Sequence, residues 1–269
     1  MPDQSIIGII PCGGNASRIS PLPCSKEIYP IGFTDEKDPS KKRPKVVSSS
    51  LIDKMVEGGG AEIFMVIKKG KWDIPNYFGD GAAYGANIAY AVVEKPFGVP
   101  FTIDQVYPFT KNKIVLFGFP DILFSPKDAY RKLLMNYDNG DYDVILGLFP
   151  VREKHKWDMV KTNSSGEVID IKMKPRETDF EYAWVIACWG SKFSSFNHQY
   201  CKEFLHKTDQ KAINKNQQST EFHLGHVFQE AIEKGLRVQS VIFDSGKCID
   251  IGTPEDLLNV SGNTNMLNL

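Results

Sequence analysis

The chain has 269 residues, of which 42% are hydrophobic, and its 32 basic and 33 acidic residues leave a formal net charge of −1. This hydrophobic content supports a substantial core and argues against an intrinsically disordered chain. The balanced charge argues against nucleic acid or a membrane surface as the main partner. The length suits one α/β domain, so we expect a single domain over residues 1–269.

The cysteines and the start of the chain indicate the compartment. Five cysteines are scattered along the sequence and form no C-x-x-C pair, which favours free thiols in a reducing environment. The chain does not begin with a basic segment followed by an apolar core, and no apolar run reaches about 18 residues. We therefore expect a soluble cytoplasmic protein.

The first predicted element is a buried strand over residues 5–11, apolar on both faces as in a parallel sheet. The loop after it holds small residues and then two cations: Gly13, Gly14, Ala16, Arg18 and Lys26. Small residues let the backbone approach an anion, and the two cations would neutralise further charge. A glycine pair alone is more often a tight turn, but this position after a strand favours a phosphate-binding loop.

Strands and helices alternate through the first half of the chain. Residues 33–44 are polar and rich in proline, which indicates an exposed excursion. Apolar patterns then predict a helix over 46–58, strands over 61–67, 88–93 and 113–117, a short helix over 103–109 and a helix over 128–137, with 72–85 as a loop. The order of strand, helix and strand suggests a right-handed βαβ unit.

The second half of the chain is richer in strands. Apolar patterns predict strands over 143–151, 168–173, 182–189, 238–243 and 248–252, a hairpin turn at 164–166, a helix over 222–234 and a last helix from Pro254. We therefore expect an α/β fold with a central mixed sheet, mostly parallel, that carries an antiparallel extension and is flanked by helices.

Two acidic residues lie where predicted strands end, Asp121 and Asp250. Ligands of open α/β sheets gather at the carboxyl ends of strands, and Mg²⁺ takes one or two carboxylates together with phosphate oxygens. Either aspartate could instead cap a helix or a turn. From the residues alone, both interpretations stay open.

Several other chemistries lack their motifs in this chain. The sequence has no G-x-S-x-G, no G-x-x-x-x-G-K-[ST] and no G-x-G-x-x-G after the first strand, which argues against an α/β-hydrolase, a P-loop NTPase and a dehydrogenase. His223 and His226 are three residues apart on a predicted helix, but without an evident third ligand a structural role is favoured.

Five segments, in this order, resemble the signature of the sugar-1-phosphate nucleotidylyltransferases, with glucose-1-phosphate thymidylyltransferases as the nearest general type: GGNASR with SKEIYPIG, YFGDGAAYGANIAYAV, KIVLFGFPDILF, IKMKP and CIDIGTPEDL. The resemblance covers almost the whole chain. It implies a Rossmann-like α/β fold and a Mg²⁺-dependent transfer of a nucleoside monophosphate from a nucleoside triphosphate to a sugar 1-phosphate or a related phosphate, with release of pyrophosphate.

The resemblance also implies roles for the residues of the first loop. Gly13, Gly14 and Ala16 would cradle the triphosphate. Arg18 would stabilise the transferring α-phosphate and the leaving pyrophosphate, and Lys26 would support the same charge. These roles agree with a reaction that needs in-line positioning and charge neutralisation rather than a covalent catalyst.

Later segments supply the remaining implied roles. Gly98 would lie against the base, and Lys174 would bind the acceptor phosphate. Asp121 and Asp250 would hold Mg²⁺ between the nucleotide and the acceptor, which makes Asp121 a catalytic residue together with the two cations of the first loop. The acceptor is already an anionic phosphate, so no general base is required.

The sequence departs from the family pattern where substrates would be recognised. Met173 replaces the glutamate that holds sugar hydroxyls, and Asp158 stands where the family often has glycine. We expect Asp158 to bind the acceptor, either by accepting from hydroxyls or by pairing with an amine. The base-reading glutamine of the thymidylyl type falls on Val93, beside Glu94, so the base stays open.

Two other functions compete with catalysis of this transfer. One is a non-catalytic relative that binds a nucleotide or a sugar nucleotide and regulates a partner, although such a protein would not need to keep both Asp121 and Asp250. The other is a nucleotide-sugar glycosyltransferase, which typically carries D-x-D after a strand, whereas Ile122 and Leu123 follow Asp121 here. The acceptor and the formation of a homo-oligomer also stay open.

Overall fold

The computed structural model describes residues 5–33, 42–94, 97–139, 141–209 and 222–262. Most of the excursion expected over residues 33–44 therefore lies outside the described residues. The strands are β1 Ile6–Cys12, β2 Pro30–Phe33, β3 Pro44–Val46, β4 Glu62–Lys68, β5 Asn87–Val93, β6 Ile114–Gly118, β7 Ile122–Ser125, β8 Val144–Pro150, β9 Asp158–Thr162, β10 Val168–Met173, β11 Tyr182–Trp189, β12 Val238–Ile242 and β13 Lys247–Asp250.

Helices connect and cover these strands. They are α1 Ser49–Glu57, α2 Asp73–Phe78, α3 Val99–Asp104, α4 Tyr107–Thr110, α5 Ala129–Asp138, α6 Ser191–Asp209, α7 Leu224–Glu233 and α8 Pro254–Gly262, with short 3₁₀ turns over Lys26–Ile28, Ala82–Tyr84 and Lys154–Lys156. None of the helices in the described part of the chain is long and apolar enough to cross a membrane. All five cysteines are free thiols, as expected.

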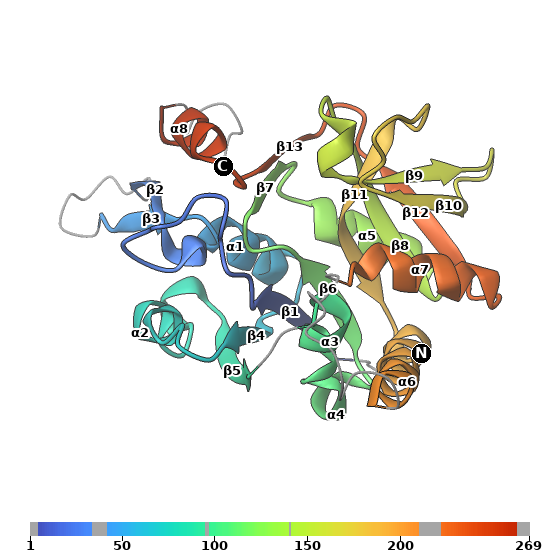
Figure 1. Ribbon diagram of the computed structural model, residues 1–269, viewed down its shortest axis with the longest axis horizontal. Coiled ribbons are helices and arrows are strands. Elements are labelled where there is room, and N and C mark those ends of the chain that lie inside the picture. Colours follow the sequence, from blue (N-terminus) through green and yellow to red (C-terminus); the bar gives the residue numbers. More distant parts are fainter. Residues whose placement is uncertain (1–4, 34–41, 95–96, 140, 210–221, 263–269) are drawn as a thin grey trace.

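The main sheet has nine strands within the described residues, in the order β10-β9-β11-β6-β1-β4-β5, and β8 and β12 branch from β11 (Figure 1). The strands β5, β4, β1 and β6 are parallel. Beyond them, β11 is antiparallel to β6, β8 and β9, and β10 forms a hairpin with β9. The expected mixed sheet, with a parallel half and an antiparallel extension, is confirmed.

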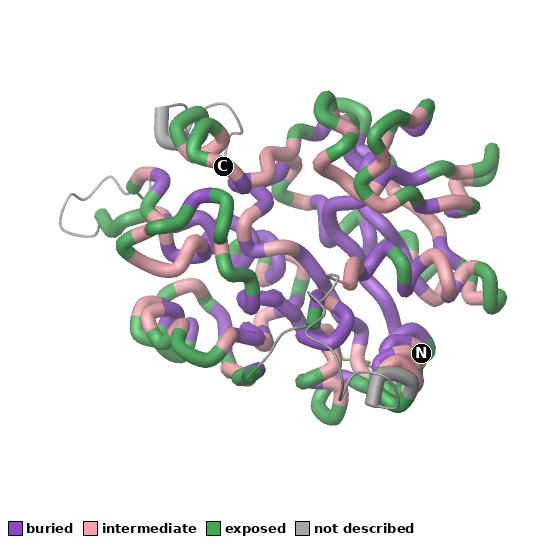
Figure 2. Tube along the Cα trace, in the orientation of Figure 1, coloured by how far each residue is buried: buried purple, intermediate pink, exposed green. Residues whose placement is uncertain are grey.

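The strands of the parallel half are apolar on both faces because helices cover both faces. Ile10 on β1 packs into a cluster with α1 and α5, which includes Met55 and Tyr130. Its neighbour Ile9 points the other way, into a cluster with α3, α6 and α7 that includes Phe228. Alternation along the strand therefore supplies two cores. Figure 2 shows the central strands buried and the helices exposed on their outer sides.

Some elements differ from the predictions. Residues 72–85, expected as a loop, contain α2, and the single short helix expected over 103–109 is instead α3 and α4, with Pro100 in the first turn of α3. The strands β2, β3 and β7 and the 19-residue helix α6 were not predicted. Polar residues outnumber apolar ones along α6 and obscure its pattern, although Phe193, Phe196 and Tyr200 recur at helical spacing.

A small third cluster joins the edge elements. The hairpin β2–β3, the pair β13–β7 and the helix α8 surround it. Its buried residues are Ile31, Val47, Leu123, Ile251 and Val260. Because this cluster joins Ile31 and Val47 to Leu123, Ile251 and the last helix, it holds the segment that carries Asp250 against the strand that follows Asp121.

Candidate active site

A cavity of about 480 Å³ opens at the carboxyl ends of β1 and β6. After β1 the chain continues to β4 on one side of β1, and it later returns to β6 on the other side. Such a change of direction leaves a crevice at the strand ends, where open α/β sheets bind ligands. Every residue predicted for the site lines this cavity except Ala16.

The loop after β1 has the backbone expected of a close approach to a ligand. A Cβ added to Gly14 would meet no protein atom within 4 Å, so the space beside it is open. Ala16 does not line the cavity, but its φ of 50° lies in the left-handed region, which is uncommon for a residue that carries a Cβ. Ala16 thus shapes the loop rather than the cavity wall.

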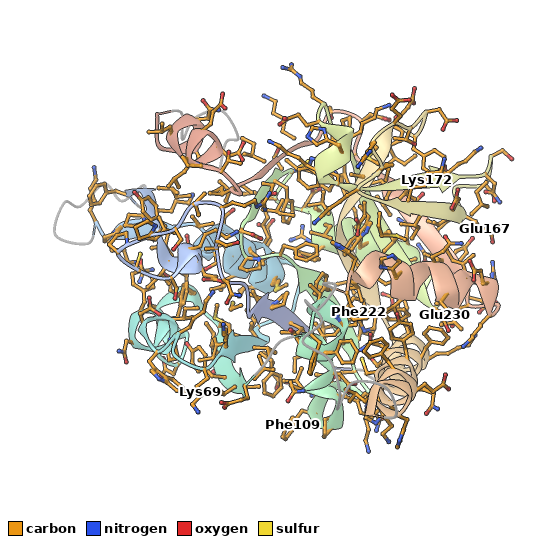
Figure 3. The ribbon with its side chains drawn as sticks, in the orientation of Figure 1. Lys69, Phe109, Glu167, Lys172, Phe222 and Glu230 are labelled. Carbon is orange, nitrogen blue, oxygen red and sulfur yellow. The ribbon has the colours of Figure 1, made fainter. Side chains whose placement is uncertain are left out.

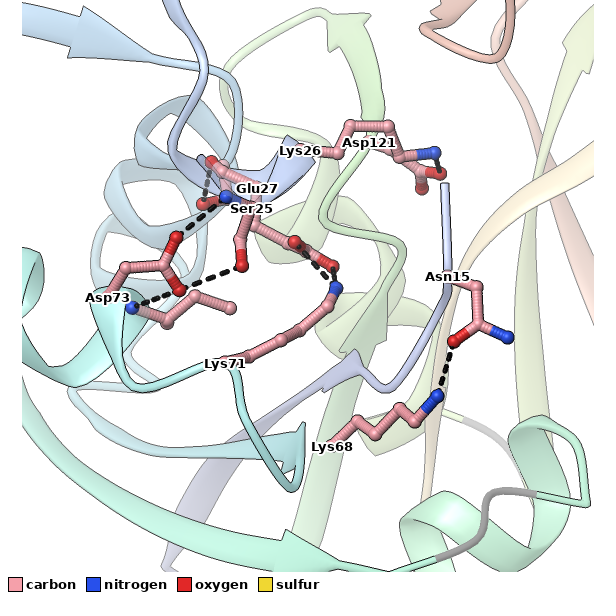
Figure 4. A network of polar contacts seen from close by, with 10 residues as sticks. Asn15, Ser25, Lys26, Glu27, Lys68, Lys71, Asp73 and Asp121 are labelled. Carbon is pink, nitrogen blue, oxygen red and sulfur yellow. Dashed lines mark hydrogen bonds and ion pairs between the residues drawn. The ribbon is translucent and has the colours of Figure 1, made fainter. Parts of the chain in front are cut away.

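A set of polar side chains at the end of β4 and just after it holds this loop in place (Figure 4). Lys68 Nζ donates to Asn15 Oδ1 at 2.6 Å, Lys71 Nζ donates to both carboxylate oxygens of Glu27 at 2.7 and 2.9 Å, and Asp73 accepts from the backbone N–H and the hydroxyl of Ser25 at 2.6 and 2.8 Å. None of these contacts was predicted from the sequence. The partners lie between 44 and 53 residues apart, so no local spacing could have indicated them.

Two aspartates and two cations gather where the strands end. Lys26 forms an ion pair with Asp121, and the Arg18 guanidinium lies 3.9 Å from Asp250 Oδ2. The antiparallel pair β13–β7 sets Asp250 opposite Ile122, the residue after Asp121, which brings the two carboxyl groups together. The predicted grouping of these four side chains is therefore present in the fold.

The charges in this group act on one another. Burial and then the nearby charge of Asp121 raise the pKa of Asp250 to about 6. Burial alone would lower the pKa of Lys26, but the carboxylates of Asp121, Asp250 and Glu27 outweigh it and the pKa is raised. Lys26 is therefore a firmly charged ammonium in a partly buried site.

The donor set of this group suits Mg²⁺. Asp121 and Asp250 supply carboxylate oxygens, and the described residues contain no cluster of three or more histidine, cysteine or acidic side chains that would complete an all-protein site. Mg²⁺ is commonly held by one or two carboxylates with substrate phosphates and water. A pair of neighbouring carboxylates that line the cavity fits this pattern.

The opposite wall of the cavity carries Asp158 and Lys174. The hairpin β9–β10 pairs Asp158 with Met173, and the Lys174 N–H donates to the Trp157 carbonyl at 3.1 Å. Lys174 has a φ of 41°, an uncommon conformation for a residue with a side chain. Burial raises the pKa of Asp158 to about 6, although Lys174 opposes this shift.

Gly98 lines the cavity, and the fold itself requires a glycine at this position. Its φ is 138°, and an added Cβ would lie 2.3 Å from the Phe222 carbonyl oxygen. Phe222 lies beside the start of α3, where it can be found in Figure 3, and forms a bridge with Gly98. A close backbone contact therefore explains the glycine at this position without a base.

His223 and His226, three residues apart in the sequence, lie at the start of α7. His223 precedes α7 as its N-cap residue and lines the cavity, and the His226 N–H donates to the His223 carbonyl at 3.2 Å. No metal cluster that includes them exists among the described residues.

The buried pair Glu27–Lys71 leads to a prediction about stability. Glu27 is only 2% exposed, so Lys71→Met would leave a carboxylate buried without its cation. We expect the free energy of unfolding at pH 7, measured in urea, to fall by about 3 kcal/mol. The double variant Glu27→Gln with Lys71→Met should recover most of this loss.

The neighbouring Lys69 provides a matched control. Its Nζ lies 3.1 Å from Glu94 Oε1, but both side chains are more than half exposed. Lys69→Met should change the free energy of unfolding by less than about 0.5 kcal/mol. Equal losses in Lys71→Met and Lys69→Met would contradict the assignment of Glu27–Lys71 as the pair that supports the loop.

Comparison with known sequences identifies relatives. The sequence model of the family described as "Nucleotidyl transferase" matches residues 7–266. A low-salt glycan biosynthesis nucleotidyltransferase of Haloferax volcanii is 24% identical over 260 residues, and a glucose-1-phosphate thymidylyltransferase of Streptomyces antibioticus is 19% identical over 265 residues. Both alignments cover 94% of this chain, but the chain spans only 64% of the length of either relative.

Solved structures share the fold. A Bacillus anthracis protein described as a glucose-1-phosphate thymidylyltransferase, in complex with sucrose, superposes with a TM-score of 0.78 at 20% identity. The superposition covers 98% of this chain and 97% of the Bacillus anthracis chain. A UDP-glucose pyrophosphorylase with bound UDP-glucose superposes with a TM-score of 0.74 at 15% identity, over 97% of this chain and 98% of the pyrophosphorylase chain. The expected Rossmann-like architecture is confirmed.

Proposed function

This chain belongs to the nucleotidyl transferase family, and we propose that it transfers a nucleoside monophosphate from a nucleoside triphosphate to a sugar 1-phosphate, or a related phosphate, with release of pyrophosphate. The observation that carries the proposal is the meeting of three features in one cavity. These are the small-residue loop after β1, the cations Arg18 and Lys26, and the paired carboxylates Asp121 and Asp250.

The chemistry of the transfer matches what these residues supply. The reaction exchanges one phosphate–oxygen bond for another, and negative charge builds on the leaving pyrophosphate. Arg18 can contact phosphate through two parallel N–H groups, and Lys26 adds a point charge. Lys26 is held in the cavity by its ion pair with Asp121 before the substrate arrives, so this group needs little reorganisation.

Mg²⁺ would be held by Asp121 and Asp250 together with phosphate oxygens. When bound, it supplies charge neutralisation at the reacting phosphates. On the other wall, Lys174 would bind the acceptor phosphate, and Asp158 would contact the rest of the acceptor. Gly13, Gly14 and Gly98 line the cavity where we place the nucleotide.

The names of the relatives support a sugar phosphate as the acceptor. The thymidylyltransferase from Streptomyces antibioticus is named for glucose 1-phosphate, and the pyrophosphorylase structure contains UDP-glucose. Aromatic rings of Trp157, Trp184 and Phe119 also line this chain's cavity, and such rings pack well against the apolar face of a sugar.

A screen of pyrophosphate release tests the proposal. Five nucleoside triphosphates would be combined with a panel of hexose 1-phosphates and other phosphorylated small molecules, each with Mg²⁺ and with EDTA. We expect turnover for at least one pair, loss of turnover in EDTA and recovery when Mg²⁺ is added in excess.

Two results would contradict the proposal. In the screen, binding of a nucleotide without pyrophosphate release from any pair would favour the non-catalytic relative. In a separate assay supplied with nucleotide sugars, release of a nucleoside diphosphate would favour a glycosyltransferase instead.

A further inference from the structure

The short helix α3 carries part of the cavity wall. Its N-cap residue Gly98 and the helical residues Val99 and Thr102 line the cavity. The helix has only six residues, and helices of this length are marginal in water without support from the rest of the protein. Backbone contacts with Phe222 hold the start of α3. The position of this part of the wall therefore depends on the contacts that hold the remainder of the helix.

Two consecutive residues of α6 hold α3 near both of its ends. Asn197 Nδ2 donates to the Pro100 carbonyl, in the first turn of α3, at 3.1 Å. His198 Nδ1 lies 2.9 and 3.1 Å from the two carboxylate oxygens of Asp104, the last residue of α3. Figure 1 shows α6 beside α3 and α4. The partners are 97 and 94 residues apart, so both contacts are tertiary.

Burial and ring stacking strengthen and orient these contacts. Asn197 is only 3% exposed, and a hydrogen bond shielded from water is stronger than an exposed one. The His198 ring stacks on the ring of Tyr107, the first residue of α4, with 3.9 Å between centroids and 11° between planes. The stack fixes the plane of the imidazole, and this plane directs Nδ1 at the Asp104 carboxylate.

The helix α6 itself lies outside the cavity. None of the lining residues that the structure describes belongs to Ser191–Asp209. Asn197 and His198 therefore do not contact a ligand in the cavity, and any effect that they have on binding passes through α3. Because Gly98, Val99 and Thr102 belong to α3 or precede it directly, a shift of this helix moves the cavity wall.

We infer that Asn197 and His198 are positioning residues that hold α3 against the bound nucleotide. This inference rests on the proposed function, in which the nucleotide lies against Gly98. It goes further because it assigns a role to two residues outside the cavity and limits their effect to one substrate. The acceptor residues Asp158 and Lys174 belong to the opposite wall, so the acceptor should bind as before.

Variants of the two residues test the inference. Asn197→Leu keeps a side chain of similar size and removes the donor, and His198→Phe keeps an aromatic ring on Tyr107 and removes the contact with Asp104. Steady-state pyrophosphate release would be measured with each substrate varied in turn. For both variants we expect the nucleotide KM to rise about 10-fold or more, with kcat and the acceptor KM within about twofold of wild type.

Hydrogen exchange measures the position of α3 without any substrate. In the free protein, amide exchange over residues 98–104 should be faster in Asn197→Leu than in wild type, because the helix opens more often when its tie to α6 is lost. Exchange in β9 and β10, which carry the opposite wall, should be unchanged.

Two control variants separate positioning from stability. Gln199 is exposed on the same helix, and its amide donates to Glu203 within α6 at 2.9 Å, so Gln199→Leu should leave both KM values within about twofold. Leu133 is fully buried on α5, away from the cavity. Leu133→Ala should lower the melting temperature and leave both KM values unchanged, which a general loss of stability in the α6 variants would not reproduce.

The outcomes separate this inference from the proposed function. Equal rises in the nucleotide and acceptor KM values, or a nucleotide KM within twofold of wild type in both variants, would overturn the inference and leave the proposed function intact. If Asn197→Leu does not fold, His198→Phe decides.

A failure of the proposed function still leaves the inference testable. If no pair of substrates releases pyrophosphate, titration calorimetry of the wild type and the two variants with the five nucleoside triphosphates and Mg²⁺ decides. Affinity about 10-fold weaker in the variants would support the inference. Equal affinities, or no binding to the wild type, would overturn it.

Discussion

Replacing Asp121 by asparagine is expected to lower kcat/KM for nucleotidyl transfer by about 1,000-fold, or roughly 4 kcal/mol of transition-state stabilisation. The substitution removes the carboxylate charge that would hold Mg²⁺ beside the reacting phosphates. An asparagine oxygen can still accept from Lys26, whose Nζ contacts Asp121 Oδ2, so the first loop should keep its position. Initial rates of pyrophosphate release over a range of Mg²⁺ concentrations would measure the effect.

A carboxylate outside the cavity provides the control. Asp244 is exposed and accepts from the Tyr182 hydroxyl at 2.7 Å, away from the residues that line the cavity. Asp244→Asn should leave the rate within about twofold of wild type, as expected of a surface change. If Asp121→Asn kept more than a tenth of wild-type activity while melting normally, the assignment of Asp121 as a metal ligand would be wrong.

The second large effect is expected for Arg18→Met. The Arg18 side chain is 60% exposed, and its guanidinium lies as far as 3.9 Å from the Asp250 carboxylate. Such an exposed, loose ion pair adds little to the stability of the free protein. With substrates bound, however, the guanidinium would face the transferring phosphate and the leaving pyrophosphate. We expect kcat to fall between about 100-fold and 1,000-fold, with a melting temperature close to that of wild type. Steady-state kinetics with saturating nucleotide would measure the change.

Arg131 is a closely matched control for this experiment. Its guanidinium lies 3.7 Å from Glu57 and its side chain is 59% exposed, but it lies on α5, away from the cavity. Arg131→Met should change kcat by less than about twofold. Arg18→Lys should recover only part of the activity, since lysine keeps the charge but loses the fork of N–H groups. Full activity of Arg18→Met would exclude a role for this side chain in the transfer.

Much of the fold could be predicted from local patterns. Apolar residues on both faces of 6–10 and 114–117 indicated buried parallel strands, and glycines at 58–60 marked the end of α1. These signals are local because helix and strand formation depends on side chains within one or two turns. Where the apolar pattern was weak, as in α2 and α6, the prediction failed, since those helices depend on tertiary packing against the rest of the molecule.

The candidate site was predictable in part for a similar reason. Asp121 and Asp250 could be selected because each follows or ends a strand, and the sheet collects strand ends at one edge. Their partners could not be selected in this way. Glu27 and Lys71 are 44 residues apart, and only the folded chain shows that the pair supports the phosphate-binding loop.

The sequence by itself determined the residue types of the site and their order along the chain. It placed small residues and cations after the first strand and acids at two later strand ends, because backbone approach and charge are properties of single residues. Only the tertiary structure decided which of them meet. The register of β13 with β7 sets Asp250 opposite Ile122, beside Asp121, because pairing between distant strands depends on the packing of the whole fold rather than on local spacing.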